Sequence, residues 1–460
     1  MARTRSRAEG TPADLTGHVV VRLAVLPSPA AGSLEEVSGG SMLTALGDAL
    51  ADLGNPRNAR LVTTLGQGDL AAVERRSPGR QVRRSLAQYW RIDVGGLRAS
   101  PVEVARRLAL LPEVETAYAE RAVSLPSSRT SRPGGTGLFR QRYLAPAPVG
   151  VDAAAAWARL GGRGEGVRLA DVESAWRETH VELRRLGLRL VAGLNDKDDA
   201  DAVDHGTATL GVVAAADDGQ GVTGLATRLE SVHLASHVDD VIATDVAGAI
   251  TAAARHLRAG DVLLLEVQRG LTDPILPTES EEADLVAIDL AVGAGITVIE
   301  AAGNGGLDLD LRPEPQLHGG FDSGAVVVGA ARSAVVDGVG HRRRADSNHG
   351  SRVDCHAWGE NVTTSGYGTL PVGDGAEDAM YTAGYAGTSS ASAIVAGVTT
   401  VVQGMARAAH GAPLDPVALR DLLRDPRNTT PQVPTRTGLL HHVGGMPDLA
   451  KLAVAVRALP

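Results

Sequence analysis

The chain has few of the features that mark a disulfide-bonded, membrane-spanning or nucleic-acid-binding protein. Its 460 residues include a single cysteine, Cys355, which excludes an internal disulfide framework and reads as a buried small hydrophobe rather than a second nucleophile. No apolar run approaches the roughly 18 residues of a membrane span. The formal net charge of -9 supplies no basic stripe for a nucleic acid. With 43% apolar residues, the chain is long enough for one large and one small domain.

The N-terminus has no recognisable secretory signal. Residues 1–7 are basic, as at the start of a signal peptide, but no apolar segment follows them. The nearest apolar stretch, residues 18–27, is interrupted by Arg22 and lacks a small-residue cleavage site. We therefore expect a cytoplasmic protein, with secretion by another route as the alternative.

A segment of small residues near the C-terminal end predicts a buried helix that presents a nucleophile. Residues 384–397 read GYAGTSSASAIVAG, and Ser389 lies where this helix is expected to begin. Backbone N–H groups and the helix dipole favour negative charge there, so the Ser389 hydroxyl is well placed to act as a nucleophile. A capped core helix without chemistry is the alternative.

A serine nucleophile needs a base to accept its proton and a third group to orient that base. Upstream, residues 164–171 form a glycine turn and a short apolar strand that ends on Asp171. His205 starts the sequence HGTATLG, where a helix is expected to open. Residues 296–304 form an apolar strand that leads into Asn304, which glycines flank. Taken singly, the three have structural alternatives as a turn residue, a helix cap and a loop residue.

Together, these segments resemble the subtilisin-like serine peptidases. The family's nucleophile motif is Gly-Thr-Ser-x-Ala-Ser-Pro-x-Val-Ala-Gly, and this chain departs from it by having Ala393 in place of the proline. The order of Asp, His and Ser along the chain is that of the family. The resemblance implies that Asp171 orients His205 and that His205 is the general base for the serine. It also implies that the Asn304 amide stabilises the oxyanion together with the backbone N–H of Ser389.

Residues 1–123 predict a small α+β domain with a ferredoxin-like order of elements. Strands are expected over 18–26, 59–65, 89–94 and 114–123, and helices over 41–53 and 100–111. The second helix begins with Ser100 as cap and Pro101 in the first turn. This order suits an open-faced sheet backed by two helices. The domain resembles the inhibitory propeptides that precede subtilisin-like domains, and an unrelated binding appendage is the alternative.

Residues 124–147 have the composition of a linker, in which Arg129 and Arg132 mark a candidate processing region. Over residues 148–460, short apolar strands alternate with helices. This rhythm predicts an α/β domain whose mainly parallel sheet is flanked by helices on both faces, with chemistry at the carboxyl ends of the strands. The family resemblance covers about residues 140–450 and implies the subtilisin-like fold.

The specificity surface departs from the family pattern. Relatives end the strand before the oxyanion segment in Ser-Leu-Gly-Gly, and its free edge pairs with an extended substrate. Here the stretch contains Glu266, Val267 and Gln268, which we expect to contact substrate together with Glu300 and Gly303. If one or both glutamates face the cleft, they favour a positively charged substrate side chain beside the scissile bond, or raise each other's pKa as a close pair. A polar network, or the opposite face of the sheet, is the alternative.

Residues 195–201 are dense in carboxylates just before His205. Calcium takes such oxygen ligands, and members of the family often carry stabilising calcium. The run matches no defined calcium loop, so a solvated acidic turn is the favoured interpretation and a structural calcium is the alternative. The chemistry requires no metal or other cofactor.

The sequence thus predicts a serine endopeptidase that hydrolyses an extended polypeptide through an acyl-enzyme and is made as a self-inhibited zymogen. Its partners would be a peptide or protein substrate and its own N-terminal domain. A peptide-binding pseudoenzyme is the alternative of a different class. Within the enzyme class, a specific peptide-maturation peptidase competes with a broad degradative one.

Overall fold

The computed structural model describes residues 14–38, 43–77, 84–125, 140–240, 243–314, 317, 322–370 and 376–459. The linker expected over 124–147 lies largely outside these residues, including both of its arginines.

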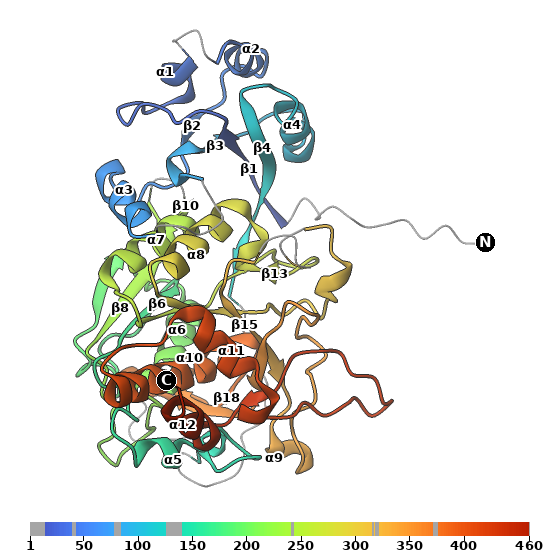
Figure 1. Cartoon of the computed structure of the whole chain (residues 1–460). Helices are drawn as coiled ribbons and strands as arrows, with labels where there is room; N and C mark the ends of the chain where they lie inside the picture. The colour runs from blue at the N-terminus through green and yellow to red at the C-terminus, as the bar shows by residue number, and fades with distance from the viewer. Residues whose placement is uncertain are drawn as a thin grey trace.

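The larger domain is built on a seven-stranded parallel sheet (Figure 1). The strand order is β16-β15-β14-β11-β6-β8-β7, and all six pairings are parallel. The strands are β6 (Arg168–Glu173), β7 (Arg189–Ala192), β8 (Ser231–Ser236), β11 (Val262–Leu265), β14 (Thr297–Ala301), β15 (Val326–Ala331) and β16 (Cys355–Trp358). The expected α/β sheet is confirmed.

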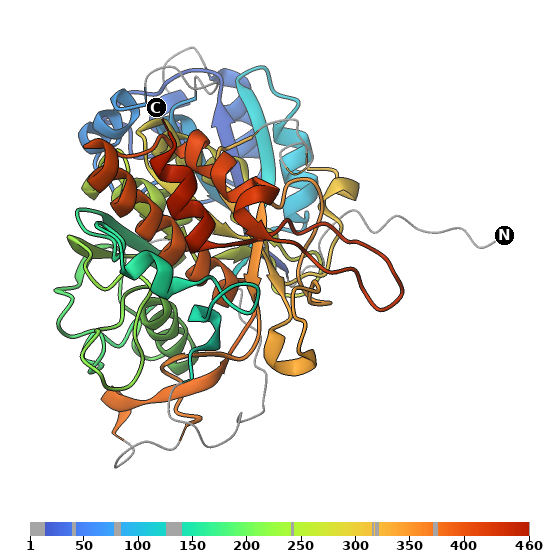
Figure 2. The same cartoon turned by 60° about the horizontal axis from the view of Figure 1, so that its bottom comes forward.

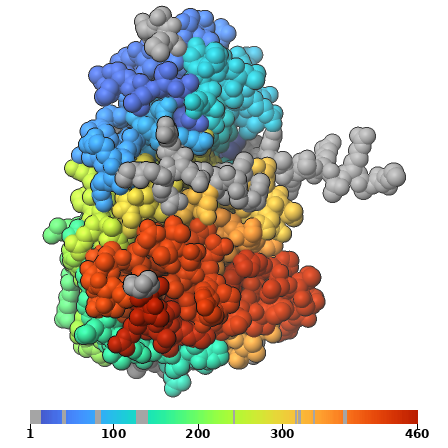
Figure 3. Space-filling model, in the orientation of Figure 1, coloured from blue at the N-terminus to red at the C-terminus, as the bar shows by residue number. Residues whose placement is uncertain are grey.

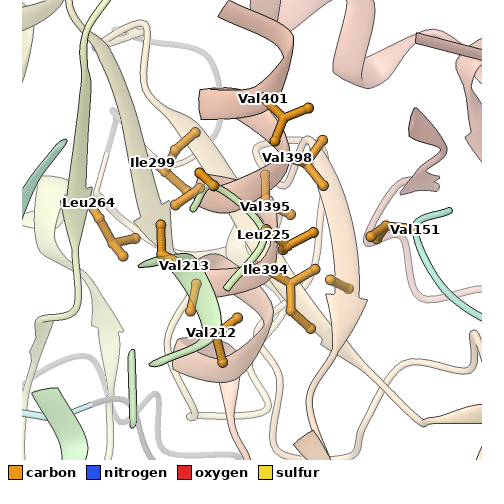
Figure 4. Close-up of a cluster of buried hydrophobic side chains, with 14 of the residues drawn as sticks. Val151, Val212, Val213, Leu225, Leu264, Ile299, Ile394, Val395, Val398 and Val401 are labelled. Carbon is orange, nitrogen blue, oxygen red and sulfur yellow. The ribbon is translucent and has the colours of Figure 1, made fainter. Parts of the chain in front are cut away.

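Helices cover both faces of this sheet because each strand alternates between two apolar clusters. In β6, Leu169 belongs to a core shared with α6 (Ala200–Ala214) and α10 (Thr388–His410). The next residue, Ala170, belongs to a core shared with α7 (Val246–His256) and α8 (Glu282–Gly293). Alternate residues of a strand point to opposite faces, so each face is buried by its own pair of helices. Figure 4 shows the first core, where α10 meets Leu264 and Ile299 from the sheet.

The central helix α10 is almost entirely enclosed. Small residues let it approach its neighbours closely: a Cβ on Gly397 would lie 2.6 Å from Leu225, and one on Gly404 would lie 2.3 Å from the carbonyl of Gly161. In the described part of the chain it is the one helix long and apolar enough to cross a membrane, and its apolar window is wholly buried. Such burial is typical of a core helix. Figure 2 shows α10 to α12 together in red.

The remaining elements complete the larger domain around this core. They are α5 (Ala153–Trp157), β9 (Val238–Asp239), β10 (Ala243–Thr244), α9 (Ala334–Asp337), β17 (Val362–Ser365), β18 (Tyr381–Tyr385), α11 (Pro416–Arg424), β19 (Thr429–Thr430), β20 (Met446–Pro447) and α12 (Leu449–Arg457).

The smaller, N-terminal domain is an antiparallel sheet of order β2-β3-β1-β4 with α2 and α4 alongside it. The chain order β-α-β-β-α-β is the expected ferredoxin-like one. Its elements are β1 (Leu15–Leu23), α1 (Leu34–Ser38), α2 (Thr44–Asp52), β2 (Asn58–Arg60), α3 (Gln67–Arg75), β3 (Tyr89–Asp93), α4 (Pro101–Leu108) and β4 (Val114–Arg121). α1 and α3 are additional to the elements expected from the sequence.

The two domains share a packed interface (Figure 3), in which the open face of the small sheet meets α7 and α8. Val20 and Tyr89 from this sheet belong to the same apolar core as those two helices. Asp245 adds a polar link. One of its oxygens caps α7 by accepting the N–H of Gly248 at 2.8 Å, and the other accepts the N–H groups of Thr63 and Thr64 at 3.0 and 3.1 Å.

A second link is a short three-stranded sheet of order β13-β12-β5. Its strands are β5 (Val123–Ser124), β12 (Gln268–Arg269) and β13 (Leu276–Pro277). β5 pairs antiparallel with β12, with Ser124 opposite Gln268. The chain that leaves the small domain therefore adds a strand to an edge of the large domain, and the domain boundary expected after residue 123 falls inside this strand.

Candidate functional site

Ser389 is the second residue of α10. The helix is preceded by Gly387, whose φ of +99° is a conformation that favours glycine. The side chain of Ser389 is fully buried, and its Oγ lies 2.9 Å from Nε2 of His205. At this position the first backbone N–H groups of the helix have no intrahelical partner and favour developing negative charge.

His205 lies between Ser389 and a carboxylate. Its Nδ1 is 2.7 Å from Oε1 of Glu173, at the end of β6. A carboxylate accepts a hydrogen bond, so this contact places the imidazole proton on Nδ1 and leaves Nε2 free to accept the serine proton. Thr209, one helical turn after His205, also donates to Glu173, at 3.1 Å. The Tyr385 ring packs edge-on against the imidazole, with 5.6 Å between the two ring centroids.

The carboxylate that contacts His205 is therefore Glu173, and not the expected Asp171. The expectation took β6 to end at residue 171, but its pairing with β8 continues to Glu173 opposite Ser236. Asp171 points to the same face two residues earlier, and its Oδ2 accepts the indole N–H of Trp176 at 2.8 Å. Both carboxyls are fully buried.

His205 is the sixth residue of α6 and does not open it, because the helix begins at Ala200. Asp199 caps this helix by accepting the N–H groups of Asp201 and Ala202, both at 3.1 Å. In the described ranges no group of three or more His, Cys, Asp or Glu residues could hold a metal ion. Asp199 in the acidic run thus serves as a helix cap, and a structural calcium stays a prediction.

Asn304 follows β14 and faces the start of α10. Its Oδ1 accepts both the backbone N–H and the hydroxyl of Thr388, at 3.0 and 3.1 Å. These contacts fix the orientation of the amide, so that its NH₂ group points away from Thr388. Within the described residues this buried Nδ2 has no hydrogen-bond partner. Gly303, just before it, has φ +92°, and a Cβ there would lie 2.8 Å from Asn348.

Glu266 follows β11 and is fully buried beneath the N-terminus of α10. Ser392 Oγ lies 2.7 Å from its Oε1, and also 2.8 Å from the carbonyl of Thr388. Burial and the charge of Glu173 raise the pKa of Glu266 well above its usual range, while contacts with Ser392 and Ser389 oppose the increase. The Ser392 hydroxyl donates to Glu266 and so links this carboxyl to the first turn of α10.

Glu300 lies on the opposite face of the sheet from Glu266. It is fully buried, and its Oε1 accepts the N–H of Glu279 at 2.8 Å. Burial, and then the charge of Glu279, raise the pKa of Glu300 well above its usual range. The two glutamates therefore do not form a close pair, and Glu300 follows the alternative considered from the sequence, a polar network on the opposite face of the sheet. The side chain of Val267 likewise packs into the core beneath α7 and α8.

Gln268 was expected to contact substrate, and its side chain contacts an extended segment, the strand β5. Its Oε1 accepts the N–H of Asn304 at 2.9 Å, while its Nε2 donates to Ser124 Oγ at 3.0 Å. Leu125, the next residue of that segment, packs against Ala175, Ala202 and Val203. The last two of these precede His205 by less than one helical turn, so the segment reaches the site.

Three buried carboxyls surround the histidine and serine. Burial raises the pKa of Asp171 and of Glu173 well above their usual ranges, as it does for Glu266. Burial lowers the pKa of His205 to about 4, although the charge of Asp171 opposes this decrease. A low-dielectric site disfavours every charge, so the imidazole is neutral at pH 7 and can accept a proton. Cys355 is buried elsewhere, with a raised pKa that is unsuited to a nucleophile.

Four residues were predicted from the sequence to share one site: Asp171, His205, Asn304 and Ser389. Glu173 was not predicted. The available signal was the two-residue periodicity of a strand, which places Asp171 and Glu173 on one face. The sequence Asp-Val-Glu therefore offers two carboxyls to the same histidine, and the length of the strand decides between them.

Comparison with known proteins agrees with this architecture. The sequence model of the subtilase family, Peptidase_S8, matches residues 191–444. No curated protein sequence matches the chain. Among solved structures, fervidolysin from Fervidobacterium pennivorans, a keratinolytic enzyme related to subtilisin, is similar with a TM-score of 0.60 and 18% identity. That match covers 97% of this chain and 62% of fervidolysin, so this chain spans less than two thirds of fervidolysin's length.

A protease from Pseudoalteromonas arctica PAMC 21717 is similar with a TM-score of 0.50 and 20% identity, over 69% of this chain and 98% of its own. At such identities these likenesses concern the fold, whereas the family match covers more than half of the sequence. The chain belongs to the subtilase family, the subtilisin-like serine peptidases.

Proposed function

We propose that the chain is a serine endopeptidase in which Ser389 is the nucleophile, His205 the general base and Glu173 the orienting carboxylate. The observation that carries the proposal is the continuous contact from Ser389 Oγ to His205 Nε2 at 2.9 Å and from His205 Nδ1 to Glu173 at 2.7 Å. This geometry supplies a serine with a base and the base with an orienting group.

The reaction begins when Ser389 Oγ attacks the scissile carbonyl carbon and its proton moves to Nε2 of His205. Glu173 holds the Nδ1 proton and stabilises the imidazolium that forms. The carbonyl oxygen becomes an oxyanion, which the Asn304 amide and the backbone N–H of Ser389 would bind. His205 then gives its proton to the leaving amine. A water molecule, deprotonated by the same histidine, hydrolyses the acyl-enzyme and restores Ser389.

The buried, unpartnered Nδ2 of Asn304 supports the oxyanion role. A buried donor without a partner is costly, so it is expected to have a function. Because Thr388 occupies the oxygen of this amide, its NH₂ group is free to bind a negatively charged oxygen. The interaction would form only as charge develops, which lowers the barrier rather than tightening ground-state binding.

The N-terminal domain is proposed to be an intramolecular inhibitor that makes the chain a zymogen. Supporting this, β5 occupies the edge of β12, and Leu125 reaches the residues beside His205. A strand in that place blocks the edge on which a peptide substrate would add. The open face of the small sheet is buried against α7 and α8, which holds the domain in position.

Two alternatives carry different expectations. A peptide-binding pseudoenzyme would use the same strand edge but would have no need of the serine, histidine, glutamate and asparagine arranged around it. Within the enzyme class, the side chain of Gln268 on the β12 edge favours a specific maturation peptidase over a broad degradative one. A cytoplasmic location stays part of the proposal. The proposed reaction uses protein side chains alone and needs no cofactor.

A fluorophosphonate probe tests the proposal, because it reacts with an activated serine. The full-length chain is incubated with the probe over hours, and the modified residue is identified by peptide mass spectrometry. We expect a single adduct on Ser389. Ser389→Ala should abolish it, whereas the matched control Ser390→Ala should retain it, because Ser390 Oγ contacts only the carbonyls of Gly387 and Trp358 in the described structure. A folded chain that takes up no probe even after its N-terminal domain has been removed would support the pseudoenzyme, because that domain is proposed to block the site.

A further inference from the structure

Gln268 lies between the candidate site and the segment that leaves the N-terminal domain. Its Oε1 accepts the N–H of Asn304 at 2.9 Å, and its Nε2 donates to Ser124 Oγ at 3.0 Å and to the carbonyl of Leu125 at 3.2 Å. The residue is 4% exposed, so these groups replace water as its partners. A single buried amide thus touches both the proposed oxyanion residue and the strand that occupies the cleft.

The orientation of this amide is determined by Asn304. A backbone N–H can donate only to an oxygen, so Oε1 of Gln268 must face Asn304. The NH₂ end must then face the paired strand. Rotating the amide by 180° would place two N–H groups against each other and would leave the Leu125 carbonyl without this donor. The side chain therefore presents two donors to whatever segment lies on β12.

The hydroxyl of Ser124 satisfies both neighbours that it meets. It accepts a hydrogen bond from Gln268 and donates one to the carbonyl of Gly270 at 2.7 Å. An aliphatic side chain in that position would leave the amide and the carbonyl unpaired at a half-buried site. The free-energy cost of leaving such groups unpaired exceeds the net gain from forming the hydrogen bond. The position opposite Gln268 therefore disfavours aliphatic side chains.

The paired position belongs to the cleft and not to a remote surface. Ser124 is in register with Gln268 across the strand pair. The residue that follows it, Leu125, packs against Val203, two residues before His205. A peptide that replaced this segment on β12 would place its corresponding side chains in the same two environments.

We propose that Gln268 is a specificity-determining residue that selects serine or threonine at the substrate position paired with it. The proposal rests on the proposed function, because it takes the segment through Ser124 to stand for a substrate strand. The substrate class is thus an extended peptide with a hydroxyl side chain opposite Gln268, followed by an aliphatic residue against Val203.

The test uses the full chain and its own segment as the ligand. All proteins carry Ser389→Ala, so that no peptide bond can be cut. Ser124→Thr and Ser124→Val are compared, because threonine and valine have the same shape and differ by a hydroxyl against a methyl. Hydrogen exchange with mass spectrometry measures how fast amides of residues 121–125 exchange, which reports the opening of β5 from β12.

With Gln268 present, we expect exchange to be roughly 2- to 10-fold faster in Ser124→Val than in Ser124→Thr, the range for one neutral hydrogen bond. In a Gln268→Met background this ratio should shrink, because the amide no longer distinguishes the two side chains. If Gln268→Met does not fold, Gln268→Leu takes its place, since it likewise removes the amide donors. An equal rate for Thr and Val, or a ratio that Gln268→Met leaves unchanged, would overturn the proposal.

This result is separable from the peptidase proposal because hydrogen exchange requires no catalysis. A chain that labels at Ser389 but shows no difference between threonine and valine loses only the role of Gln268. A chain that shows the difference but never labels at Ser389 loses the peptidase, while Gln268 remains a residue that recognises its own segment.

Discussion

Glu173 Oε1 lies 2.7 Å from Nδ1 of His205, and the proposed chemistry of the site depends on this contact. It places the imidazole proton on Nδ1 and turns Nε2 toward Ser389. Asp171, on the same face of the same strand, is engaged by Trp176 at 2.8 Å. The site therefore has one carboxyl in contact with the histidine and a second one behind it, both shielded from water.

The first prediction concerns the oxyanion donor. Asn304→Asp keeps an oxygen for the two donors of Thr388 but removes the NH₂ group. We expect kcat to fall by roughly 100- to 1000-fold, the usual loss for one such donor, with KM and the unfolding temperature little changed. Steady-state kinetics and thermal melts on both proteins measure this. Asn304→Ala should lose as much kcat, and an unchanged kcat in either variant would exclude the role.

The second prediction concerns pH. Burial lowers the pKa of His205 to about 4, and the peptidase needs the neutral imidazole. Activity should therefore persist well below pH 6.5, the usual value for histidine, and fall as His205 becomes protonated near pH 4. The contribution of His205 to the free energy of unfolding should also decrease as the pH falls from 6.5 to 4. In that range the unfolded chain binds a proton at this histidine and the folded chain does not.

The measurement is the pH profile of kcat/KM, whose acid limb reports the free enzyme. The apparent pKa belongs to the coupled His205–Glu173 pair rather than to one residue. An acid limb near pH 6.5 would mean that water reaches the histidine and would contradict the buried site.

The third prediction is self-processing. Because β5 lies on β12 and Leu125 packs against Val203, two residues before His205, cleavage of the chain after this segment would be effectively unimolecular. The parent should yield a fragment of about 320 residues that begins between residues 124 and 149. Ser389→Ala and His205→Ala should remain full length by intact mass.

Identical trimming of the parent and of Ser389→Ala would show that another protease acts. A parent that stays full length and active would show that the N-terminal domain is a permanent module.

The fourth prediction concerns charge in the cleft. Glu266 is fully buried beneath the N-terminus of α10, and Glu300 faces the other side of the sheet. Glu266→Gln and Glu300→Gln should therefore change the ratio of kcat/KM between Arg-containing and neutral peptides by less than about 2-fold. Paired peptides that differ at one position provide the measurement. A loss confined to the Arg-containing peptides would show an ionised glutamate facing substrate.

Much of the fold could be read from the sequence because its signals are local. Apolar strands alternating with helices predicted the parallel sheet, and the glycine before Ser389 predicted the start of α10. The order of elements in residues 15–121 predicted the small antiparallel sheet. These features follow from periodicity and turn chemistry, which act within a few residues.

The parts that could not be read depend on where elements end and on contacts between distant segments. The last residue of β6 is set by its pairing with β8, so choosing between Asp171 and Glu173 required the structure. The opposite orientations of Glu266 and Glu300 depend on register between strands. The contact of Gln268 with Ser124 joins residues 144 positions apart, which no local pattern reveals.

The most direct test of the role of Glu173 compares it with Asp171 through the rate at which Ser389 reacts with a fluorophosphonate. The second-order rate constant for fluorophosphonate reaction at Ser389 is measured for Glu173→Gln and Asp171→Asn, each with the N-terminal domain in the same state as in the parent. Both changes replace a carboxyl group by an amide of nearly the same shape. We expect Glu173→Gln to slow the reaction by roughly 1000-fold or more, as for loss of the orienting carboxylate in a catalytic triad, and Asp171→Asn to slow it by less than about 10-fold. A larger loss in Asp171→Asn than in Glu173→Gln would contradict the assignment of Glu173 as the residue that orients His205.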